Sequence, residues 1–286
     1  MTSKAQIVDQ AHYWRNIELP DTWPDDASLK TPRHLLQIFH QLISGKTGRV
    51  SLPDQLPGKK DLPKYLFQEF HSLPNGNYSK RIASGYIHSF DTVMLGTVRR
   101  ERRALAQRFA GCRVAVDIGC GGGHMARALK DAGVDTVWGV EPSPYLLQLA
   151  AKENPGINLI QGIAEATGLP DNCADLVSLC FVFHEVPPRY ANQALREIHR
   201  ILKPGGHLVF IEPSPDQLEL GKWQLFRQFG WRGLYFSAMA RKVFEPFIRA
   251  WHGRDIDSWL SDYGFQPLEN RIAMPLRTVV AKRADH

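Results

Sequence analysis

The sequence has few cysteines, and none is placed as a metal or redox site would require. Its 286 residues include four cysteines, and no two have the spacing of a zinc site or of a redox motif. This scarcity favours reduced thiols in a cytosol and gives no reason to expect a bound metal. The four positions are Cys112, Cys120, Cys173 and Cys180.

Long apolar runs are also missing. The longest lies within residues 174–186, far short of the roughly twenty residues that a membrane span needs. Residues 1–15 lack the apolar core of a signal peptide, and no repeat or low-complexity tract appears. With 43% hydrophobic residues, the chain can bury one large core with additions. The sequence therefore predicts a soluble cytoplasmic protein.

Acidic residues are fewer than basic ones, 29 against 35, which gives a formal net charge of +6. Such a balance permits nucleic-acid binding, and the run RRERR at residues 99–103 invites that interpretation. The arginines would point around much of a helix, however, with Glu101 among them. We interpret the run as a solvated helix face and expect no nucleic-acid partner.

The most informative segment is VAVDIGCGGGH, residues 114–124. Val114 and Val116 predict a short buried strand, the glycines predict a turn almost without side chains, and a helix is expected to begin near His124. Such a turn lets a ligand press against the backbone, while the helix N-terminus presents free N–H groups to it. The segment predicts a nucleotide-type cofactor site at the first crossover of a doubly wound sheet.

Two cofactors fit such a turn. Residues 121–126 match the G-x-G-x-x-A fingerprint of a dinucleotide site, with Glu141 about twenty residues further on. Asp117, however, lies at the strand end, where its carboxylate would repel a pyrophosphate. It suits the ammonium group of S-adenosylmethionine (SAM), which carries no phosphate, because opposite charges attract strongly where water is scarce. We therefore favour SAM, with NAD as the alternative.

Strands and helices alternate further along the chain. Residues 135–143 predict a second strand that ends in Glu141, whose carboxylate can accept hydrogen bonds from both ribose hydroxyls. An apolar stretch predicts a strand that is buried on both faces, and an amphipathic helix follows it. The third, fourth and fifth strands are expected within residues 157–170, 174–186 and 207–213, and the helix at 189–206.

With these motifs the chain resembles the class I SAM-dependent methyltransferases, in particular the small-molecule branch that includes the ubiquinone and menaquinone C-methyltransferases. VDIGCGGG matches the first motif of that family and VEPS its acidic second motif. GLPDNCADLV matches the approach to the fourth strand, and LKPGGHLVF the turn before the fifth. The resemblance covers about residues 113–213, with a return at 264–283. It implies a Rossmann-like α/β fold with a doubly wound, mostly parallel seven-stranded sheet and an antiparallel C-terminal strand.

The resemblance also implies how SAM binds. Residues 117–121 would hold its methionine part and Glu141 its ribose. Relatives often carry Asp-Ala where this chain has Ile163-Ala164, and Ile163 cannot accept the hydrogen bond that this Asp takes from adenine. Packing and backbone groups would hold the adenine instead, or Glu165 would reach across. The candidate cofactor-binding residues are Asp117, Gly119, Cys120, Gly121, Glu141, Pro142, Ile163, Ala164 and Cys180.

Two regions lie outside the resemblance. Residues 1–110 predict a helical extension, with helical apolar spacing at 32–43 and 62–73 and a helix or helix pair over 78–110. In this enzyme class such an extension usually forms a lid over SAM and the acceptor, although its residues would equally serve to pack a helix on the sheet. The lid candidates are Tyr78, Arg81 and Tyr86.

The second region is an insertion at about residues 214–254 within the expected SAM-binding domain, 111–286. It is dense in aromatic residues with Lys and Arg among them. We favour a helical cap over the acceptor. A plain amphipathic helix pair and an interfacial membrane helix are the alternatives, so peripheral membrane contact stays open. The candidate acceptor-wall residues are Trp223, Phe226 and Tyr235.

The catalytic candidate is His184, with Glu185 as its neighbour on the substrate side. Both follow the fourth strand, whose end faces the SAM methyl group in this fold. A histidine titrates near neutrality and can take a proton from a phenol or an activated carbon. The alternative is that His184 only shapes the pocket. No Asn-Pro-Pro-Tyr-type sequence, as many nucleic-acid N-methyltransferases have, follows this strand.

The sequence thus predicts methyl transfer from SAM to a small, aromatic or otherwise hydrophobic acceptor. Two alternatives remain at this point: an NAD-dependent oxidoreductase, and a non-catalytic SAM-binding regulatory or scaffold subunit. The identity of the acceptor atom and the oligomeric state are not indicated by any motif.

Overall fold

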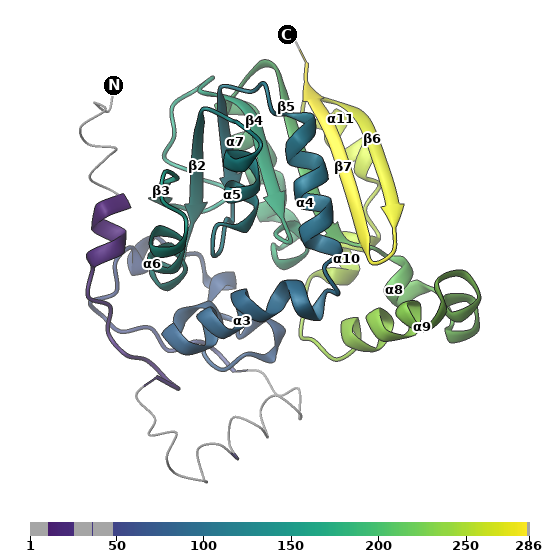
Figure 1. The fold of residues 1–286 in the computed structure, drawn as a ribbon, viewed down its shortest axis with the longest axis horizontal. Coiled ribbons are helices and arrows are strands. Elements are labelled where there is room, and N and C mark those ends of the chain that lie inside the picture. Colours follow the sequence, from purple (N-terminus) through teal and green to yellow (C-terminus); the bar gives the residue numbers. More distant parts are fainter. Residues whose placement is uncertain (1–10, 26–35, 37–47, 285–286) are drawn as a thin grey trace.

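The computed structural model describes residues 11–25, 36 and 48–284. Its centre is a seven-stranded sheet in the order β3-β2-β1-β4-β5-β7-β6 (Figure 1). Strands β1 to β5 pair in parallel, and β7 runs antiparallel to both of its neighbours. The predicted fold class is therefore confirmed. The strands are β1 (Val114–Ile118), β2 (Thr136–Glu141), β3 (Asn158–Gln161), β4 (Ala174–Cys180), β5 (Leu202–Pro213), β6 (Phe265–Ala273) and β7 (Leu276–Arg283).

Helices cover both faces of the sheet. Leu105, Leu129 and Leu147 belong to one buried cluster, which covers one face. Leu195 and Leu260 belong to another cluster, which covers the opposite face. This double cover explains why β1 and β4 are apolar on both sides rather than alternating. The first face is packed by α4 (Thr97–Arg108), α5 (His124–Asp131) and α6 (Pro144–Glu153), and the second by α7 (Pro188–Ile201) and α11 (Ile256–Asp262).

The N-terminal extension contains less helix than the sequence predicts. Residues 62–73 form two short 3₁₀ turns instead of one helix. The helical path is broken first at Gln68, whose backbone is extended (φ −103°, ψ 147°), and again at His71 and Ser72, which have positive φ angles of 57° and 58°. The expected helix at 32–43 lies outside the described residues, apart from position 36. The turns in this region are η1 (Lys59–Asp61), η2 (Lys64–Phe67), η3 (Phe70–Ser72) and η4 (Gly76–Tyr78).

The helix pair predicted over residues 78–110 is present. Helix α3 (Lys80–Val93) is followed by α4, and the chain turns between them at Leu95 and Gly96, where both φ angles are positive. Ser79 caps α3, since its side chain accepts a hydrogen bond from the Ile82 N–H. In Figure 1, α3 lies across the carboxyl ends of β1, β2 and β4, the edge at which this type of sheet binds its ligands.

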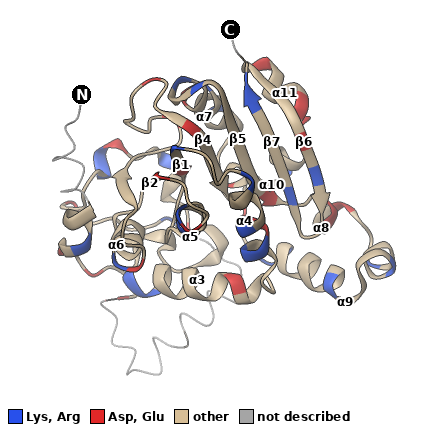
Figure 2. Cartoon of the chain, turned by 45° about the horizontal axis from the view of Figure 1, so that its top comes forward, with Lys and Arg blue, Asp and Glu red and all other residues tan. Residues whose placement is uncertain are grey.

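The insertion between β5 and β6 is helical, as expected. It contains α8 (Asp216–Glu219), α9 (Lys222–Ala240) and α10 (Ile248–His252) ahead of α11. Gly230 has φ 62° and ψ −150°, so α9 consists of two arms that point in different directions. Figures 1 and 2 show α9 projecting from the body beyond α8, and Figure 2 marks basic but no acidic residues on it. Within the described residues, no helix is both long and apolar enough to cross a membrane.

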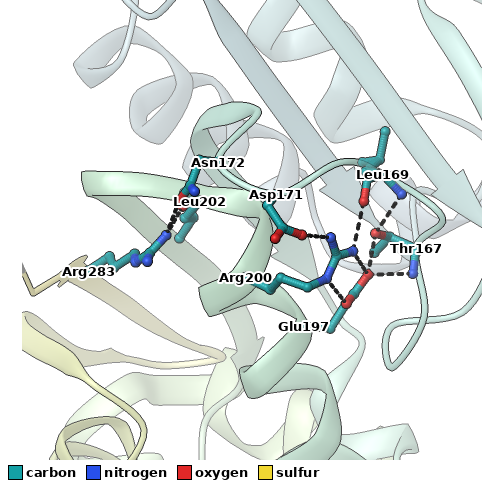
Figure 3. Close-up of polar contacts among 8 residues, drawn as sticks. All are labelled: Thr167, Leu169, Asp171, Asn172, Glu197, Arg200, Leu202 and Arg283. Carbon is teal, nitrogen blue, oxygen red and sulfur yellow. Dashed lines mark hydrogen bonds and ion pairs between the residues drawn. The ribbon is translucent and has the colours of Figure 1, made fainter. Parts of the chain in front are cut away.

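A polar cluster fixes the loop between β3 and β4 to α7 (Figure 3). Glu197 Oε1 accepts hydrogen bonds from the Thr167 N–H at 2.8 Å and from the Thr167 hydroxyl at 2.6 Å. Arg200 pairs with Glu197 at 2.7 Å and donates to the Leu169 carbonyl at 2.7 Å. Arg283 donates to Asn172 at 2.6 Å, which ties the end of β7 to the same loop.

Candidate functional site

The glycine turn between β1 and α5 is packed from two sides. Gly119 has a φ of 66°, and a Cβ added there would lie 2.6 Å from Val182 Cγ2. A Cβ on Gly122 would lie 2.5 Å from Ile87 Cγ2 of α3. Larger residues at either position would therefore displace the segment after β4 or the helix that covers the turn. The glycines let these two elements close around one space.

That space, the glycine-loop cavity, lies at the carboxyl ends of β1, β2 and β4. It holds about 1210 Å³ of empty volume, counting the part open to solvent, enough for a nucleoside-sized ligand and part of a second molecule. All nine predicted cofactor-binding residues line it, so the structure brings the whole set together. They are Asp117, Gly119, Cys120, Gly121, Glu141, Pro142, Ile163, Ala164 and Cys180.

Two of these residues are buried acids. Asp117 is 1% exposed and accepts hydrogen bonds from the Ala126 N–H at 3.0 Å and the Ser178 hydroxyl at 2.8 Å. Glu141 accepts from the Gly121 N–H at 3.0 Å and the Ser143 N–H at 2.9 Å. Burial raises the pKa of each carboxyl to about 7 in spite of these hydrogen bonds. A ligand that brings a cation or hydroxyl donors to them would stabilise the charged forms.

The cavity also contains Arg102, which the sequence interpretation placed on a solvated helix face. Arg99, Arg100 and Arg103 are exposed, as expected, but Arg102 is 4% exposed and lines the cavity. Its guanidinium group donates to both carboxylate oxygens of Asp91, at 2.8 and 2.6 Å.

A signal for this position exists in the sequence. Val98, Arg102 and Leu105 are spaced by four and three residues, so they share one helix face, and the two apolar members of that face are buried. The interpretation of RRERR as one solvated run was wrong at Arg102, because it weighed the charges without the apolar residues beside them.

The lid candidates differ in position. Tyr78 and Tyr86 line the glycine-loop cavity, together with Ile87 and Phe90 of α3. Arg81 is exposed and lines neither cavity described here. Glu165 does not reach the cavity either, since its carboxylate accepts a hydrogen bond from Tyr65 at 3.0 Å. Tyr65 itself does line the cavity.

A second space, the apolar cavity, lies between α3, the end of β5 and the α9–α10 segment, with about 640 Å³ of empty volume. Its walls are mostly apolar, from Val93 and Met94 on one side to Met239 and Val243 on the other. Four residues line both cavities and form the wall that they share. They are His71, Tyr86, Phe90 and Phe181.

The insertion contributes to the apolar cavity through other residues than those predicted. Met239, Ala240 and Val243 line it. Trp223 and Phe226, in contrast, are 72% and 50% exposed and line neither cavity. Gly230 explains the difference, because it turns the first arm of α9 away from the site. Tyr235 also lines neither cavity and donates its hydroxyl to the Val93 carbonyl at 2.8 Å, which joins α9 to α3.

A chain of alternating carboxylates and imidazoles crosses the region next to both cavities. His184 Nδ1 lies 2.6 Å from Glu212 Oε2, and His184 Nε2 lies 3.6 Å from Glu245 Oε1. On the other side of Glu245, His71 Nδ1 lies 3.5 Å from the same oxygen, and His71 Nε2 lies 2.7 Å from Glu185 Oε1. Tyr86 reaches His71 Nε2 with its hydroxyl at 3.2 Å.

The two histidines and Glu245 stabilise one another in their charged forms. Burial alone would lower the pKa of His71, but hydrogen bonds and charges from Glu185 and Glu245 raise it to about 9. The pKa of His184 is also raised, by Glu245 and Glu212, against the effect of its burial. Burial would raise the pKa of Glu245, yet the two imidazolium groups hold it below the usual range. His71 and His184 are therefore protonated and Glu245 is ionised at neutral pH.

His184, the predicted catalytic residue, is fully buried and lines neither cavity. Its neighbour Glu185 lines the glycine-loop cavity, and His71 lines both cavities. The role of His184 as a general base stays a prediction. Its Nε2 atom faces Glu245, and Glu245 in turn faces His71, which lines both cavities. No sequence pattern singles out His71, which joins the site only through the tertiary fold.

The backbone has an unusual conformation at two residues of the wall that the cavities share. His71 and Phe181 both have non-glycine φ angles in the left-handed region, at 57° and 62°. Hydrogen bonds to residues distant in the sequence stabilise these conformations. The His71 N–H donates to the Phe244 carbonyl at 3.1 Å, and the Phe181 N–H donates to the Ile211 carbonyl at 2.8 Å. Such conformations cost energy and concentrate at functional sites. Here they aim two side chains into the wall shared by the cavities.

Comparison with known proteins places these features in a family. The family model described as "Methyltransferase domain" matches residues 116–210. A demethylmenaquinone methyltransferase from Paenarthrobacter aurescens is 33% identical over 197 residues, covering 63% of this chain and 74% of the relative. A second protein of that name, from Renibacterium salmoninarum, is 29% identical over 202 residues, covering 66% and 83%.

Solved structures support the fold. A SAM-dependent methyltransferase from Archaeoglobus fulgidus has a TM-score of 0.50 at 17% identity, covering 69% of this chain and 99% of that one. Human N-acetylserotonin methyltransferase, solved in complex with SAM, has a TM-score of 0.52 at 19% identity, covering 72% and 57%. At these identities the likeness concerns the fold alone.

Proposed function

Because the chain belongs to the SAM-dependent methyltransferases, we propose that it methylates a small, apolar, aromatic acceptor that binds in the apolar cavity. This membership makes SAM the methyl donor and overturns the alternative of an NAD-dependent oxidoreductase. It also makes the chain an enzyme rather than a scaffold subunit. The proposal concerns the acceptor and the residues that handle it.

The residues of the glycine-loop cavity fit SAM. The two buried carboxylates with raised pKa values need donors, and SAM would bring its ammonium group to Asp117 and its ribose hydroxyls to Glu141. Arg102 would meet the carboxylate of the methionine part, while Ile163 and Leu66 offer apolar surface to adenine. When bound, SAM supplies a methyl group made electrophilic by the sulfonium.

The single observation that carries the acceptor class is the wall shared by the two cavities. An acceptor in the apolar cavity would contact SAM in the glycine-loop cavity at the wall that the two cavities share. This wall consists of His71, Tyr86, Phe90 and Phe181, and three of its side chains are apolar or phenolic rings. Aromatic and apolar walls favour a flat apolar ring, and positioning of the acceptor is the main contribution that a methyltransferase can make. The two bacterial relatives are named for demethylmenaquinone, and a quinone-type ring fits the same description.

For an acceptor that loses a proton on methylation, Glu185 is the group to receive it. Its carboxylate lines the glycine-loop cavity, and His71 Nε2 holds Oε1 at 2.7 Å. The imidazolium form of His71 holds this carboxylate in place through a charged hydrogen bond. In this proposal His184 is a positioning residue: with Glu212 it fixes Glu245, which in turn holds His71 from the other side.

The experiment is a panel of acceptors assayed by formation of S-adenosylhomocysteine. Phenols and quinols of increasing ring size are each paired with an analogue that carries a carboxylate or sulfonate. Apolar members should turn over at least about tenfold faster than their charged partners, because an apolar wall cannot compensate a desolvated charge. A preference for the charged partners would refute the proposal.

A further inference from the structure

Helix α9 exposes an unusual set of side chains on both sides of its bend at Gly230. Eight large apolar side chains are exposed in the described part of the chain, and three of them lie on this one helix. Trp223 is 72% exposed, Phe226 50% and Trp231 62%. None of them lines either cavity, so the acceptor site does not account for them. Clustered exposed aromatic residues on a soluble surface usually mark an interaction site.

These aromatic residues are not needed to hold the helix in place. Leu225 and Phe236 anchor α9, with exposed fractions of 0% and 1%. Tyr235 adds its hydrogen bond to the Val93 carbonyl. The three exposed aromatic side chains bury at most half of their surface, so they contribute less to holding the helix than the two anchors do.

The charge around them has one sign. Residues 220–244 contain five basic residues and no acidic residue. Lys222 and Arg227 are exposed directly beside the aromatic side chains of the first arm. Figure 2 shows basic residues along α9 and acidic ones only on the neighbouring elements. The other three cations of this stretch are Arg232, Arg241 and Lys242.

We infer that Trp223, Phe226 and Trp231, with the cations around them, form a docking surface for an anionic lipid membrane. Tryptophan and phenylalanine partition into the boundary between headgroups and acyl chains, while Lys and Arg pair with anionic headgroups. A second copy of this chain fits less well, because it would bring its own five cations against these five. The helix would lie in the membrane surface and would not cross it.

The surface and the apolar cavity share one element. Met239, Ala240 and Val243, at the end of α9 and just beyond it, line the cavity, whereas the docking residues occupy its start. If the proposed function holds, an apolar acceptor dissolved in the membrane would reach the enzyme beside its cavity. Membrane binding itself does not depend on the acceptor, so the two proposals can fail separately.

The test is sedimentation of the full chain with lipid vesicles. One set is zwitterionic phosphatidylcholine alone, and in the other about one lipid in three is anionic phosphatidylglycerol. The chain should bind the anionic vesicles at least about tenfold more tightly than the zwitterionic ones, and added salt should weaken the binding. Tryptophan fluorescence should shift to the blue on binding, because Trp223 and Trp231 leave water.

Two variants and one control make the result specific. The combined change Trp223→Ser, Phe226→Ser and Trp231→Ser, and the combined change Lys222→Gln and Arg227→Gln, should each weaken binding about tenfold or more. The control changes two other exposed apolar residues, Leu268→Ser and Ile272→Ser of β6, and should bind as the parent does. SAM binding, measured by calorimetry, should be unchanged in all three and shows that they are folded.

Several outcomes would overturn the inference. Absence of binding to anionic vesicles would do so, as would binding that the control weakens as much as the α9 variants. Binding of an oligonucleotide in place of vesicles would make the surface a nucleic-acid site. A doubled mass in solution that the aromatic variant abolishes would make it an interface between copies.

Discussion

At the scale of single residues, Asp117 and Glu141 carry an electrostatic cost in the free protein. Burial raises the pKa of both carboxyls to about 7, against ordinary values near 4. A group whose pKa is higher in the folded than in the unfolded state binds more protons when folded. Its favourable contribution is complete below about pH 4 and is lost as the pH rises to the folded pKa, so the free protein should lose stability between about pH 4 and pH 7.

SAM binding should relieve this cost and therefore depend on pH. If the bound ammonium group holds Asp117 ionised, protons leave the protein on binding. The affinity for SAM should then rise from about pH 6 to about pH 8. Calorimetry in buffers of different ionisation enthalpy would measure the released protons. Asp117→Asn should reduce both the release and the affinity, whereas a release that is the same in parent and variant would contradict this role.

His71 offers a sharper residue-scale prediction. Since Glu185 and Glu245 raise its pKa to about 9, the proton that holds Glu185 in place is present at neutral pH and is lost above about pH 9. Turnover should fall in that range. His71→Gln should lower kcat by about 10- to 100-fold and remove the alkaline fall, as pH–rate profiles would record.

The matched control is His88→Gln, since His88 lies on the exposed side of α3 and pairs with Glu153 outside the cavities. It should keep the parent's rate and profile. His184→Gln should slow turnover but keep the alkaline fall, because His71 stays in place. If instead the alkaline fall in turnover persists in His71→Gln and disappears in His184→Gln, His184 is the titrating residue. The roles proposed for the two histidines would then be wrong.

At the scale of elements, the sequence predicted those parts of the structure that depend on neighbouring residues. Residues 114–124 predicted a strand, a glycine turn and a helix, and β1 and α5 have nearly these bounds. The positions of Asp117 and Glu141 follow from this, since the carboxyl ends of parallel neighbours meet at one edge. The helix predicted at 62–73 is absent because apolar periodicity cannot reveal the extended backbone at Gln68 or the left-handed backbone at His71 and Ser72.

The loop between β3 and β4 gives a prediction at this scale. Glu197→Ala removes the acceptor of the Thr167 N–H and hydroxyl and leaves Arg200 with Asp171 as its remaining carboxylate partner. We expect a loss of about 1–3 kcal/mol in the free energy of unfolding, measured by chemical denaturation. Glu153→Ala, which removes a more exposed pair with His88, should cost less than about 1 kcal/mol. Equal losses in the two variants would show that the loop is not held by Glu197.

At the scale of the whole molecule, the active region is assembled from distant parts of the chain. His71 comes from the N-terminal extension, Tyr86 from α3, Glu185 from the segment after β4, and Glu245 from the insertion. Each was ordinary in its local sequence. Only the tertiary fold brings them within hydrogen-bond or ion-pair distance, which is why the sequence pointed to His184 and not to His71.

The proposed donor site and the proposed acceptor site lie in two different cavities. The motif residues of the glycine-loop cavity belong to the common part of the fold, and the N-terminal extension covers them, whereas most residues of the apolar cavity belong to the N-terminal extension and the insertion. The donor site could therefore be predicted from motifs, while the acceptor site depends on segments that no motif describes. The central claim is that the acceptor binds in the second of these cavities.

The most direct measurement is the kinetic effect of filling the apolar cavity. Ala240→Phe adds a ring to its wall, while Ala238→Phe adds the same ring to an exposed position two residues earlier on α9. With the best acceptor of the panel, Ala240→Phe should raise KM by about tenfold or more and leave the SAM dissociation constant unchanged. Ala238→Phe should match the parent in both. An unchanged KM in Ala240→Phe, or a loss of SAM affinity with it, would contradict the account.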